Sequence, residues 1–374
     1  MTFTWWRMEW NKRNEYNSFN SWKGLLYADW YKAIVKGEFL PPIEASLDPI
    51  HACNLSCEHC NANRYIRGDT DLKDKRMTDA HLDNLIDFLS KWGVKAICYG
   101  GGGEPTLHRY LAKALYRTKA RGMEAAVATN GVLLNKELIR AMAQCCRWVG
   151  ISVDAGTLQT YYQGKKQNSF DVVIDNIKAL IKDIKETGSK CEVSYKFLIM
   201  PYNQDEISLA CVLAKSIGVH DFHVRPADFR HQGMGELKKK NNEFNIENIK
   251  SHFESCHKIE DKDFRVFTVM HKFDENFAPR KDFSQCYAAP IVIQLCADGN
   301  VYFCVDQRHR PEYLLGTHYP DPANILNFWG SEKHKALVFN STPKQCDTRC
   351  TFGTYCRQCE RLFTGKDPMH WKFV

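Results

Sequence analysis

The sequence predicts an α/β fold: a parallel sheet in an open or partial (β/α)6 barrel of the TIM type, followed by a small cysteine-rich C-terminal domain. Two observations predict the barrel. Short strand-like and longer helix-like segments alternate over residues 43–226, and the strands place polar and apolar residues on opposite faces. A third predicts the second domain, because the composition shifts at Cys286 to cysteine, aromatic and turn residues. We expect an aromatic-rich extension over 1–42, the barrel over 43–228, a charged helical bridge over 229–285 and the cysteine-rich domain over 286–374.

The strands and helices of the barrel follow from periodicity. One helical stripe runs from Leu82 to Leu89, between Thr78, which can cap the helix, and Gly93, which can end it. A second stripe covers 173–184 and ends at Gly188, and a further helix is expected over 244–257. The six expected strands are 43–48, 94–99, 124–129, 149–153, 192–199 and 221–225. Six units are too few for a closed eight-fold barrel, which favours an open or partial one.

Polar residues recur at every second position of four strands. Helices must cover the apolar faces, so the polar sets are expected to point into a wet, ligand-holding interior, unless some of these strands are edge strands with one face in solvent. The sets are Glu44, Ser46 and Asp48; Gly150, Ser152 and Asp154; Glu192, Ser194 and Lys196; and Asp221, His223 and Arg225. Glu192, Lys196, His223 and, less well placed, Tyr195 are candidate substrate contacts, with structural roles as the alternative.

Composition excludes several classes of protein. Of 374 residues, 44% are apolar and 25% charged, as in soluble globular proteins. No signal peptide or membrane-spanning run is present, so we expect a cytoplasmic protein without a membrane partner. The net charge of +7 is spread along the chain with one tight run at 238–240, and no nucleic-acid partner is expected. The 16 cysteines indicate metal ligation, because the cytosol keeps thiols reduced.

The most informative motif is CNLSCEHC, in which Cys53, Cys57 and Cys60 follow the first expected strand. A [4Fe-4S] cluster normally takes four cysteines, so three would leave one iron open to a substrate or cofactor. Taken alone, the triplet fits a zinc knuckle that lacks one ligand equally well.

A run of four glycines, Gly100–Gly103, followed by Glu104 ends the second expected strand. Glycines allow a ligand close access to the backbone, and Glu104 adds a fixed negative charge. A glycine run is common in turns. Its place at the carboxyl end of the strand after the cysteine triplet makes it informative, because ligands of parallel α/β folds bind there.

Together these motifs resemble the radical S-adenosylmethionine enzymes. The resemblance starts from CNLSCEHC and GGGEP and continues in order through ATNG at 128–131, ISVD at 151–154, MPYN at 200–203 and HVRP at 223–226. One departure is His59, where the family usually has an aromatic residue before the third cysteine.

The resemblance implies a [4Fe-4S] cluster on Cys53, Cys57 and Cys60, with S-adenosylmethionine chelating the open iron. An electron from an external donor such as flavodoxin or ferredoxin would cleave S-adenosylmethionine to methionine and a 5'-deoxyadenosyl radical, which abstracts hydrogen from the substrate. The implied cofactor contacts are Gly101, Gly102, Gly103, Glu104 and Pro105 to the methionyl amino group, Thr129 and Asn130 nearby, Ser152 and Asp154 to the ribose, and, as weaker matches, Asn203 and Arg225.

The C-terminal cysteines form a second constellation. Cys286 and Cys304 flank an expected hairpin over 291–303 with Asp298, Gly299 and Asn300 at its turn. The remaining members are Cys346, Cys350, Cys356 and Cys359. Alone, those four fit a zinc site. Together with the hairpin, they resemble the SPASM or twitch extension of radical S-adenosylmethionine enzymes, which implies one or two auxiliary iron–sulfur clusters.

Counting ligands limits this expectation. Even with Cys296 the domain offers seven cysteines, fewer than two four-cysteine clusters need. One complete auxiliary cluster is therefore favoured over two, without a choice of its four ligands. The histidines His108, His309 and His318 show no usable ligand spacing. Six other cysteines lie at apolar positions and are expected to be structural: Cys98, Cys145, Cys146, Cys191, Cys211 and Cys256.

Three functions remain open. We expect a radical S-adenosylmethionine enzyme of the oxidoreductase type that modifies a ribosomally made peptide. The alternative substrate is a sugar, an aminocyclitol or another small metabolite, which would be oxidised or epimerised. The non-enzyme alternative is a binding protein stabilised by zinc in both cysteine groups.

Overall fold

The computed structural model describes residues 21–67, 70–227, 243–269, 281, 283–340, 343, 346 and 350–365. Its centre is one ten-stranded sheet in the order β10-β9-β8-β1-β2-β3-β4-β5-β6-β7. The strands are β1 Glu44–Leu47, β2 Ala96–Tyr99, β3 Glu124–Thr129, β4 Cys146–Ser152, β5 Glu192–Ile199, β6 Asp221–Pro226, β7 Arg265–Thr268, β8 Val292–Leu295, β9 Asn300–Tyr302 and β10 Leu314–Thr317.

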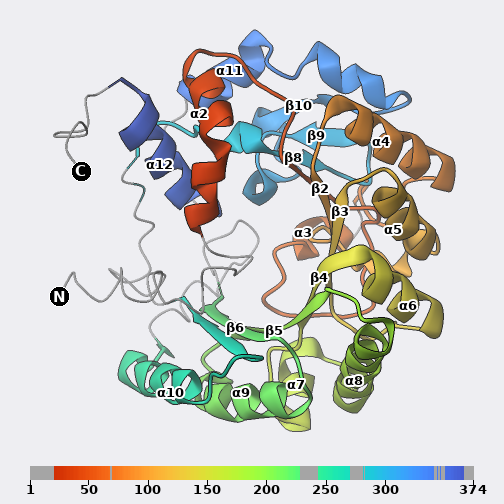
Figure 1. Ribbon diagram of the computed structural model, residues 1–374, viewed down its shortest axis with the longest axis vertical. Helices are drawn as coiled ribbons and strands as arrows, with labels where there is room; N and C mark the ends of the chain where they lie inside the picture. Colours follow the sequence, from red (N-terminus) through yellow and green to blue (C-terminus); the bar gives the residue numbers. More distant parts are fainter. Residues whose placement is uncertain are drawn as a thin grey trace.

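The predicted α/β fold with a parallel sheet is confirmed. All six expected strands are present, and β1 to β7 pair in parallel with their neighbours. Figure 1 shows the strands along an arc with helices on its outer side. The helices are α2 Ala28–Val35, α3 Asn63–Ile66, α4 Asp79–Trp92, α5 Leu111–Ala120, α6 Lys136–Cys145, α7 Leu158–Lys165, α8 Phe170–Thr187, α9 Ile207–Ser216, α10 Ile246–Lys258, α11 Glu332–Phe339 and α12 Gly353–Phe363.

The two periodic helices begin and end where their sequence signals predict. The Thr78 side chain accepts a hydrogen bond from the His81 amide at the start of α4, and Gly93 follows its end with a left-handed φ of 109°. Gly188 ends α8 in the same way, with φ 61°. Both helices bury their apolar stripe against the sheet, and this packing stabilises a helix more than its intrinsic propensity does.

The sheet extends beyond the six expected strands at both ends. Strand β7 pairs in parallel with β6, within the segment 229–285 for which only a helical bridge was expected. The expected helix of that bridge is present as α10. At the other end β8 pairs in parallel with β1, so the C-terminal hairpin covers an edge that would otherwise expose unpaired backbone groups.

The N-terminal extension is described only from Ser21 onward. Trp5, Trp6 and Trp10 of the expected aromatic segment lie outside the described residues. Helix α2 packs beside α12: the Tyr31 and Phe363 rings lie 5.4 Å apart, and the two helices are adjacent in Figure 1. The start of the described chain is thereby held against its end.

The polar residues of neighbouring strands meet on one face of the sheet, as expected. The Ser194 hydroxyl donates to Asp221 Oδ1 at 2.5 Å, and the Arg265 guanidinium lies 2.8 Å from Glu192 Oε2. The alternate residues of β5 face the apolar core, where Val193, Tyr195 and Phe197 are completely buried. The period of two therefore sorts β5 into an interior polar face and a helix-covered apolar face.

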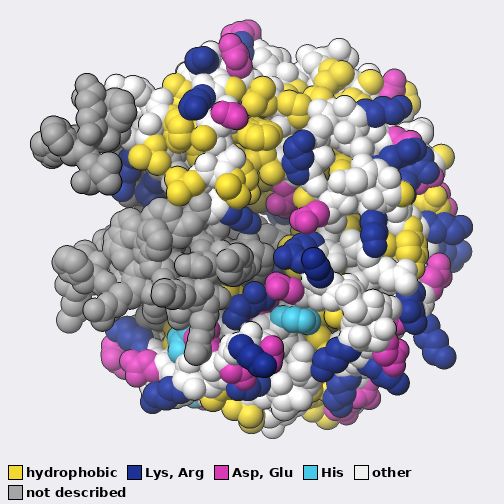
Figure 2. All heavy atoms as spheres, in the orientation of Figure 1, with side chains coloured by type: hydrophobic (Ala, Val, Ile, Leu, Met, Phe, Trp, Pro, Cys, Tyr) yellow, Lys and Arg dark blue, Asp and Glu magenta, His cyan; other side chains and the backbone are white. Residues whose placement is uncertain are grey.

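Hydrophobic side chains cluster on one part of the surface visible in Figure 2. Figure 2 shows hydrophobic side chains gathered over the α2 and β8 side of the molecule, with Lys, Arg, Asp and Glu spread over the α4 to α10 side. No helix in the described part of the chain is both long enough and apolar enough to cross a bilayer.

Candidate iron–sulfur and cofactor site

Cys53, Cys57 and Cys60 lie together in the loop that follows β1. The three thiols interact electrostatically with one another and are partly buried. The Leu55 amide donates to Cys53 Sγ at 3.4 Å, and the amides of Ala62 and Asn63 stabilise the Cys60 thiolate. Amide donors to cysteine sulfur tune the potential of an iron–sulfur cluster, so the loop suits such a group.

In the described ranges, neither the triplet nor the C-terminal cysteines form a set of three ligand atoms that all lie within 4.8 Å of one another.

The glycine run packs against the loop that carries the triplet. A Cβ on Gly103 would lie 2.4 Å from the Ile50 carbonyl oxygen and 2.6 Å from that of Ala52. The Gly102 amide donates to Asp48 Oδ1 at 3.0 Å. Glycine is therefore required here by close backbone packing within the protein. Gly101 and Pro105 flank this contact, and the predicted approach of a cofactor stays a prediction.

Glu104 joins the glycine run to the end of β3. Its carboxylate accepts hydrogen bonds from the Thr106 amide and hydroxyl, from the Thr129 hydroxyl at 2.6 Å and from the Asn130 amide at 2.7 Å. Burial raises the pKa of Glu104, and these hydrogen bonds oppose the rise. The carboxylate thus fixes the geometry of the second and third strand ends.

Asn130 reaches from β3 to the cysteine loop. Its Nδ2 donates to Asn54 Oδ1 at 2.8 Å and lies 3.9 Å from Cys53 Sγ. Its Oδ1 accepts the Val132 amide at 3.0 Å. The motif at 128–131, predicted to lie beside the cofactor, is thus in contact with the loop predicted to hold the cluster.

Asp154 lies at the end of β4 within a buried network. Its Oδ1 accepts the Leu198 amide at 2.7 Å, and its Oδ2 pairs with the Lys165 ammonium and lies 3.6 Å from His59 Nε2. Burial alone would raise the pKa of Asp154. The Lys165 charge and His59 outweigh it, so that pKa lies below its usual value. Burial alone would lower the pKa of Lys165, but the Asp154 carboxylate raises that pKa above its usual range.

The other predicted cofactor contacts differ in their surroundings. Ser152 is half-buried at the end of β4, and Arg225 is exposed on β6. Asn203 is completely buried: its Nδ2 donates to the carbonyls of Asp154 and Leu198, and its Oδ1 accepts the Met200 amide. Asn203 therefore holds the β4 and β5 ends together, and any contact with the cofactor stays a prediction.

Arg308 of the C-terminal domain reaches the strand ends of the barrel. Its Nε lies 2.8 Å from Asp48 Oδ2, and Arg64 Nη2 donates to its carbonyl at 2.6 Å. A Cβ on Gly101 would lie 2.6 Å from Arg308 Nη2. No local sequence signal marks this residue, because its partner Asp48 follows a strand far earlier in the chain.

Four C-terminal cysteines converge. Cys304 and Cys350 interact electrostatically with each other and with Cys286, and Cys356 interacts with Cys286 and Cys350. The Ala288 amide donates to Cys356 Sγ at 3.4 Å. The chain thus brings together one set of four cysteines, from the hairpin flanks and the last helix.

Two further cysteines lie near that set. Gln307 Nε2 donates to Cys346 Sγ at 3.1 Å, and Cys359 lies near Tyr31 and Cys356. The roles of all six C-terminal cysteines as ligands stay predictions.

The candidate substrate contacts lie on the interior face. Lys196 Nζ lies 4.6 Å from the centre of the Trp148 ring, and burial together with Arg225 lowers the pKa of Lys196 to about 8. Burial raises the pKa of Asp221 to about 6. His223 is buried beside them, whereas the Tyr195 hydroxyl donates to the Ala155 carbonyl on the apolar side.

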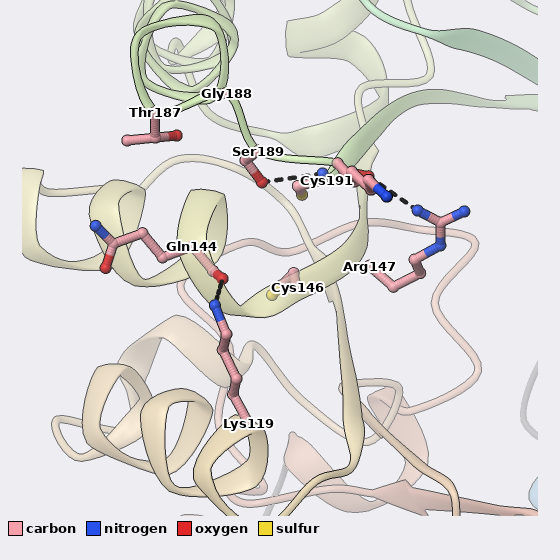
Figure 3. Close-up of a pocket in the computed structure, with 9 residues that line it drawn as sticks. Lys119, Gln144, Cys146, Arg147, Thr187, Gly188, Ser189 and Cys191 are labelled. Atoms are coloured by element: carbon pink, nitrogen blue, oxygen red, sulfur yellow. Dashed lines mark hydrogen bonds between the residues drawn. The ribbon is translucent and has the colours of Figure 1, made fainter.

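A pocket lies at the opposite, amino-terminal ends of β4 and β5, lined by Cys146, Ser189 and Cys191 among others. Figure 3 shows Lys119 donating to the Gln144 carbonyl and Arg147 donating to a backbone carbonyl across the pocket. Both cations hydrogen-bond to backbone carbonyls at the amino-terminal ends of the strands. The pocket is therefore separate from the cysteine site, which lies at the carboxyl ends.

Known proteins resemble this chain in both sequence and fold. Residues 47–209 match the model of the Radical SAM superfamily. An S-adenosylmethionine-dependent nucleotide dehydratase of Thermoplasmatales archaeon (strain ISO4-H5) is 31% identical over 103 residues, 28% of this chain and 34% of that protein. A probable GTP 3',8-cyclase of Metallosphaera sedula is 26% identical over 200 residues, 50% of this chain and 60% of that protein. The chain thus spans less than two thirds of either relative.

Among solved structures, Streptococcus suis SuiB bound to precursor peptide SuiA superposes with a TM-score of 0.62 at 15% identity. The superposition covers 90% of this chain and 75% of SuiB. SuiB has also been solved bound to S-adenosylmethionine. At this identity the likeness shows the fold, which both chains share beyond the barrel.

Proposed function

We propose a peptide-modifying role for this protein from the premise that the chain belongs to the radical S-adenosylmethionine superfamily, whose domain spans residues 47–209. The protein is accordingly an enzyme with a [4Fe-4S] cluster and S-adenosylmethionine as cofactors. When bound, these cofactors supply a 5'-deoxyadenosyl radical that removes a hydrogen atom from an unactivated carbon. The proposed reaction is oxidative modification of a ribosomally made peptide.

Different residues of the chain would then hold the cluster and orient S-adenosylmethionine. Cys53, Cys57 and Cys60 would hold the cluster and leave one coordination position open. Glu104 and Asn130 fix the adjoining strand ends through their hydrogen bonds to each other and to Asn54. This network would hold S-adenosylmethionine in one orientation, which is how positioning lowers a reaction barrier.

The peptide proposal is supported by how much of the chain resembles the fold of SuiB. The likeness to SuiB, a protein solved with its precursor peptide, covers 90% of this chain and so includes the cysteine-rich domain. The sequence matches to probable GTP 3',8-cyclases cover 50% to 68% of this chain. The peptide proposal therefore rests on the fold likeness to SuiB over the larger part of the chain.

A second candidate substrate is a small anionic metabolite such as a nucleotide. Lys196 and Arg225 interact electrostatically on the interior face, and two neighbouring cations suit a phosphate group. The names of the sequence relatives, a nucleotide dehydratase and a GTP cyclase, agree with this candidate.

The cofactor chemistry is tested by anaerobic incubation with S-adenosylmethionine and a strong reductant. We expect 5'-deoxyadenosine from the parent protein and none from the Cys53→Ala, Cys57→Ala, Cys60→Ala triple variant. Cys145→Ala, in a buried cysteine at the end of α6, is the matched control and should retain the activity. A triple variant as active as the parent would contradict the assignment of the triplet.

The substrate class is tested by deuterium transfer. Peptides encoded beside the gene and GTP are each supplied in fully deuterated form, and the mass of 5'-deoxyadenosine is measured. Deuterium from a peptide supports the proposal. Deuterium from GTP alone would assign the enzyme to nucleotides.

A further inference from the structure

Three residues from separate segments meet beside the cysteine loop: His51 after β1, Cys296 after β8 and His309 after a short 3-10 helix, Val305–Gln307. One ligand atom from each lies within 4.8 Å of the other two, and no second such group of His, Cys, Asp or Glu occurs in the ranges that the structure describes. The two imidazole rings lie 4.7 Å apart and nearly perpendicular, at 87°.

Three imidazole nitrogens of this group lack well-aligned hydrogen-bond partners in the protein. His51 is completely buried and neither of its ring nitrogens makes a hydrogen bond of good geometry; the Leu72 backbone interacts only weakly with the ring. His309 Nε2 is likewise buried without such a hydrogen bond. Buried polar groups are almost always satisfied, so two such imidazoles facing a buried thiol call for an unseen ligand. Both rings offer lone pairs to it.

The remaining contacts of His309 orient the ring. Its Nδ1 lies 3.5 Å from Asp298 Oδ2 and 3.5 Å from the Tyr302 hydroxyl, and its Nε2 has no protein partner. A carboxylate behind one ring nitrogen is the common arrangement of metal-binding histidines, because it fixes the tautomer and raises the basicity of the ligand. His309 also adopts a left-handed φ of 57°, which is uncommon for a residue with a side chain.

The charges around the group favour a bound cation. The Asp48 and Asp298 carboxylates and a Cys296 thiolate would give three negative charges, and the Arg308 and Arg64 guanidiniums give two positive charges nearby. A cation would neutralise the remaining negative charge of this buried site. A thiolate with two imidazoles is a ligand set that zinc prefers.

We propose that His51, Cys296 and His309 bind a zinc ion, with an exogenous ligand such as water in the fourth tetrahedral position. This site is distinct from the iron–sulfur chemistry of the proposed function, and it removes Cys296 from the ligands available to an auxiliary cluster. The ion would join the loop carrying Cys53 to the C-terminal hairpin. Binding requires small side-chain movements, since a zinc ion with bonds of about 2.0 to 2.3 Å draws its ligands closer than 4.8 Å.

The test uses the full-length protein, anaerobically reconstituted with iron and sulfide, supplied with zinc chloride and desalted. Metal analysis should give about one zinc per chain. X-ray absorption at the zinc edge sees zinc alone, whatever the iron content. We expect a first shell of one sulfur and two imidazole nitrogens, completed by an oxygen.

Two variants locate the ion. Cys296→Ser and His309→Gln keep the size of the side chains and should each lose zinc, whereas Cys145→Ser should keep it. Iron content and circular dichroism report whether each variant has folded. Because the absorption spectrum of the parent needs no variant, an unfolded variant does not undermine the test.

Three results would overturn the site. They are a parent without zinc above the buffer level, a first shell made only of sulfur, and zinc that remains in both folded variants. A sulfur-only shell would place the ion in a cysteine cluster instead. None of these results depends on S-adenosylmethionine cleavage, so failure of the zinc site and failure of the proposed function can be told apart.

Discussion

Replacing Lys165 by methionine would leave the Asp154 carboxylate charged, buried and without its cation. The side chains of Lys165 and Asp154 are 3% and 2% exposed, so water cannot take the place of the ion pair. Removing one partner of such a pair costs about 3 to 5 kcal/mol, because the remaining charge stays uncompensated. His59 and the Leu198 amide still contact the carboxylate and place the expected loss at the lower end of that range.

The assay is urea denaturation of the anaerobically purified protein, followed by circular dichroism. Lys165→Met is compared with Asp154→Asn and with the double variant. Because the neutral amide needs no cation, the double variant should lose less than the sum of the single losses, with a coupling of about 1 to 3 kcal/mol. Lys178→Met is the matched control: this exposed lysine pairs with Asp175 on the surface of α8 and should change the free energy of unfolding by less than about 0.5 kcal/mol.

The pH dependence of the loss gives a second check. In the parent the pKa of Asp154 lies below its usual value, so the stabilisation is complete at neutral pH and is lost only as pH falls through that low value. Without Lys165, burial would raise the pKa of Asp154, and the variant would lose stability as pH rises through it. The gap between parent and Lys165→Met should therefore be wider at pH 8 than at pH 5. A loss below about 1 kcal/mol, or strictly additive single losses, would refute the reasoning.

Three further predictions concern the loop, the interior face and the auxiliary cysteines. Gly103→Ala would place a Cβ 2.4 Å from the Ile50 carbonyl oxygen and displace the cysteine loop; iron and sulfide per chain should fall, whereas Gly122→Ala, which adds backbone strain at φ 77° but meets no atom within 4 Å of the added Cβ, should keep both. Because burial raises the pKa of Asp221 to about 6, this group should contribute a loss of about 2 to 3 kcal/mol of unfolding free energy as pH rises from 4 to 7; urea denaturation should show Asp221→Asn losing less stability than the parent over this range by about that amount, and parallel pH profiles would contradict it. Cys350→Ser should remove about four irons per chain, because Cys350 lies among the four converging cysteines, whereas Cys359→Ser should retain them; equal losses in both variants would reject that set.

The sequence predicted the elements whose signals are local. Strands β3 and β5 have the expected bounds, because alternation over six or eight residues is unmistakable. Strand β7 was missed because Arg265–Thr268 is only four residues long and lies within a charged segment. The segment is a strand because it pairs with β6. Sequence periodicity gives no information on such pairing between segments.

The candidate site likewise contains residues that have local sequence signals and residues that have none. The cysteine triplet, the glycine run and Glu104 are contiguous motifs, and their neighbourhood could be predicted from their order at strand ends. Lys165 and Arg308 could not, because each is recognised only by the carboxylate that it meets in space, Asp154 or Asp48. The His51 and His309 pair was missed for the same reason: ligand spacing along the chain says nothing of residues brought together by the fold.

Asp48 connects the two halves of the molecule. Its Oδ1 accepts the Gly102 amide at 3.0 Å, and its Oδ2 lies 2.8 Å from Arg308 Nε and accepts Gln294 Nε2 at 3.0 Å. One buried carboxylate therefore binds the glycine run on one side and the C-terminal domain on the other. Because buried polar networks have few alternative arrangements, a shift of the hairpin would be transmitted to the glycine run, beside the loop of Cys53. The C-terminal domain thus shapes the predicted cofactor site, and the barrel alone would lack this part of it.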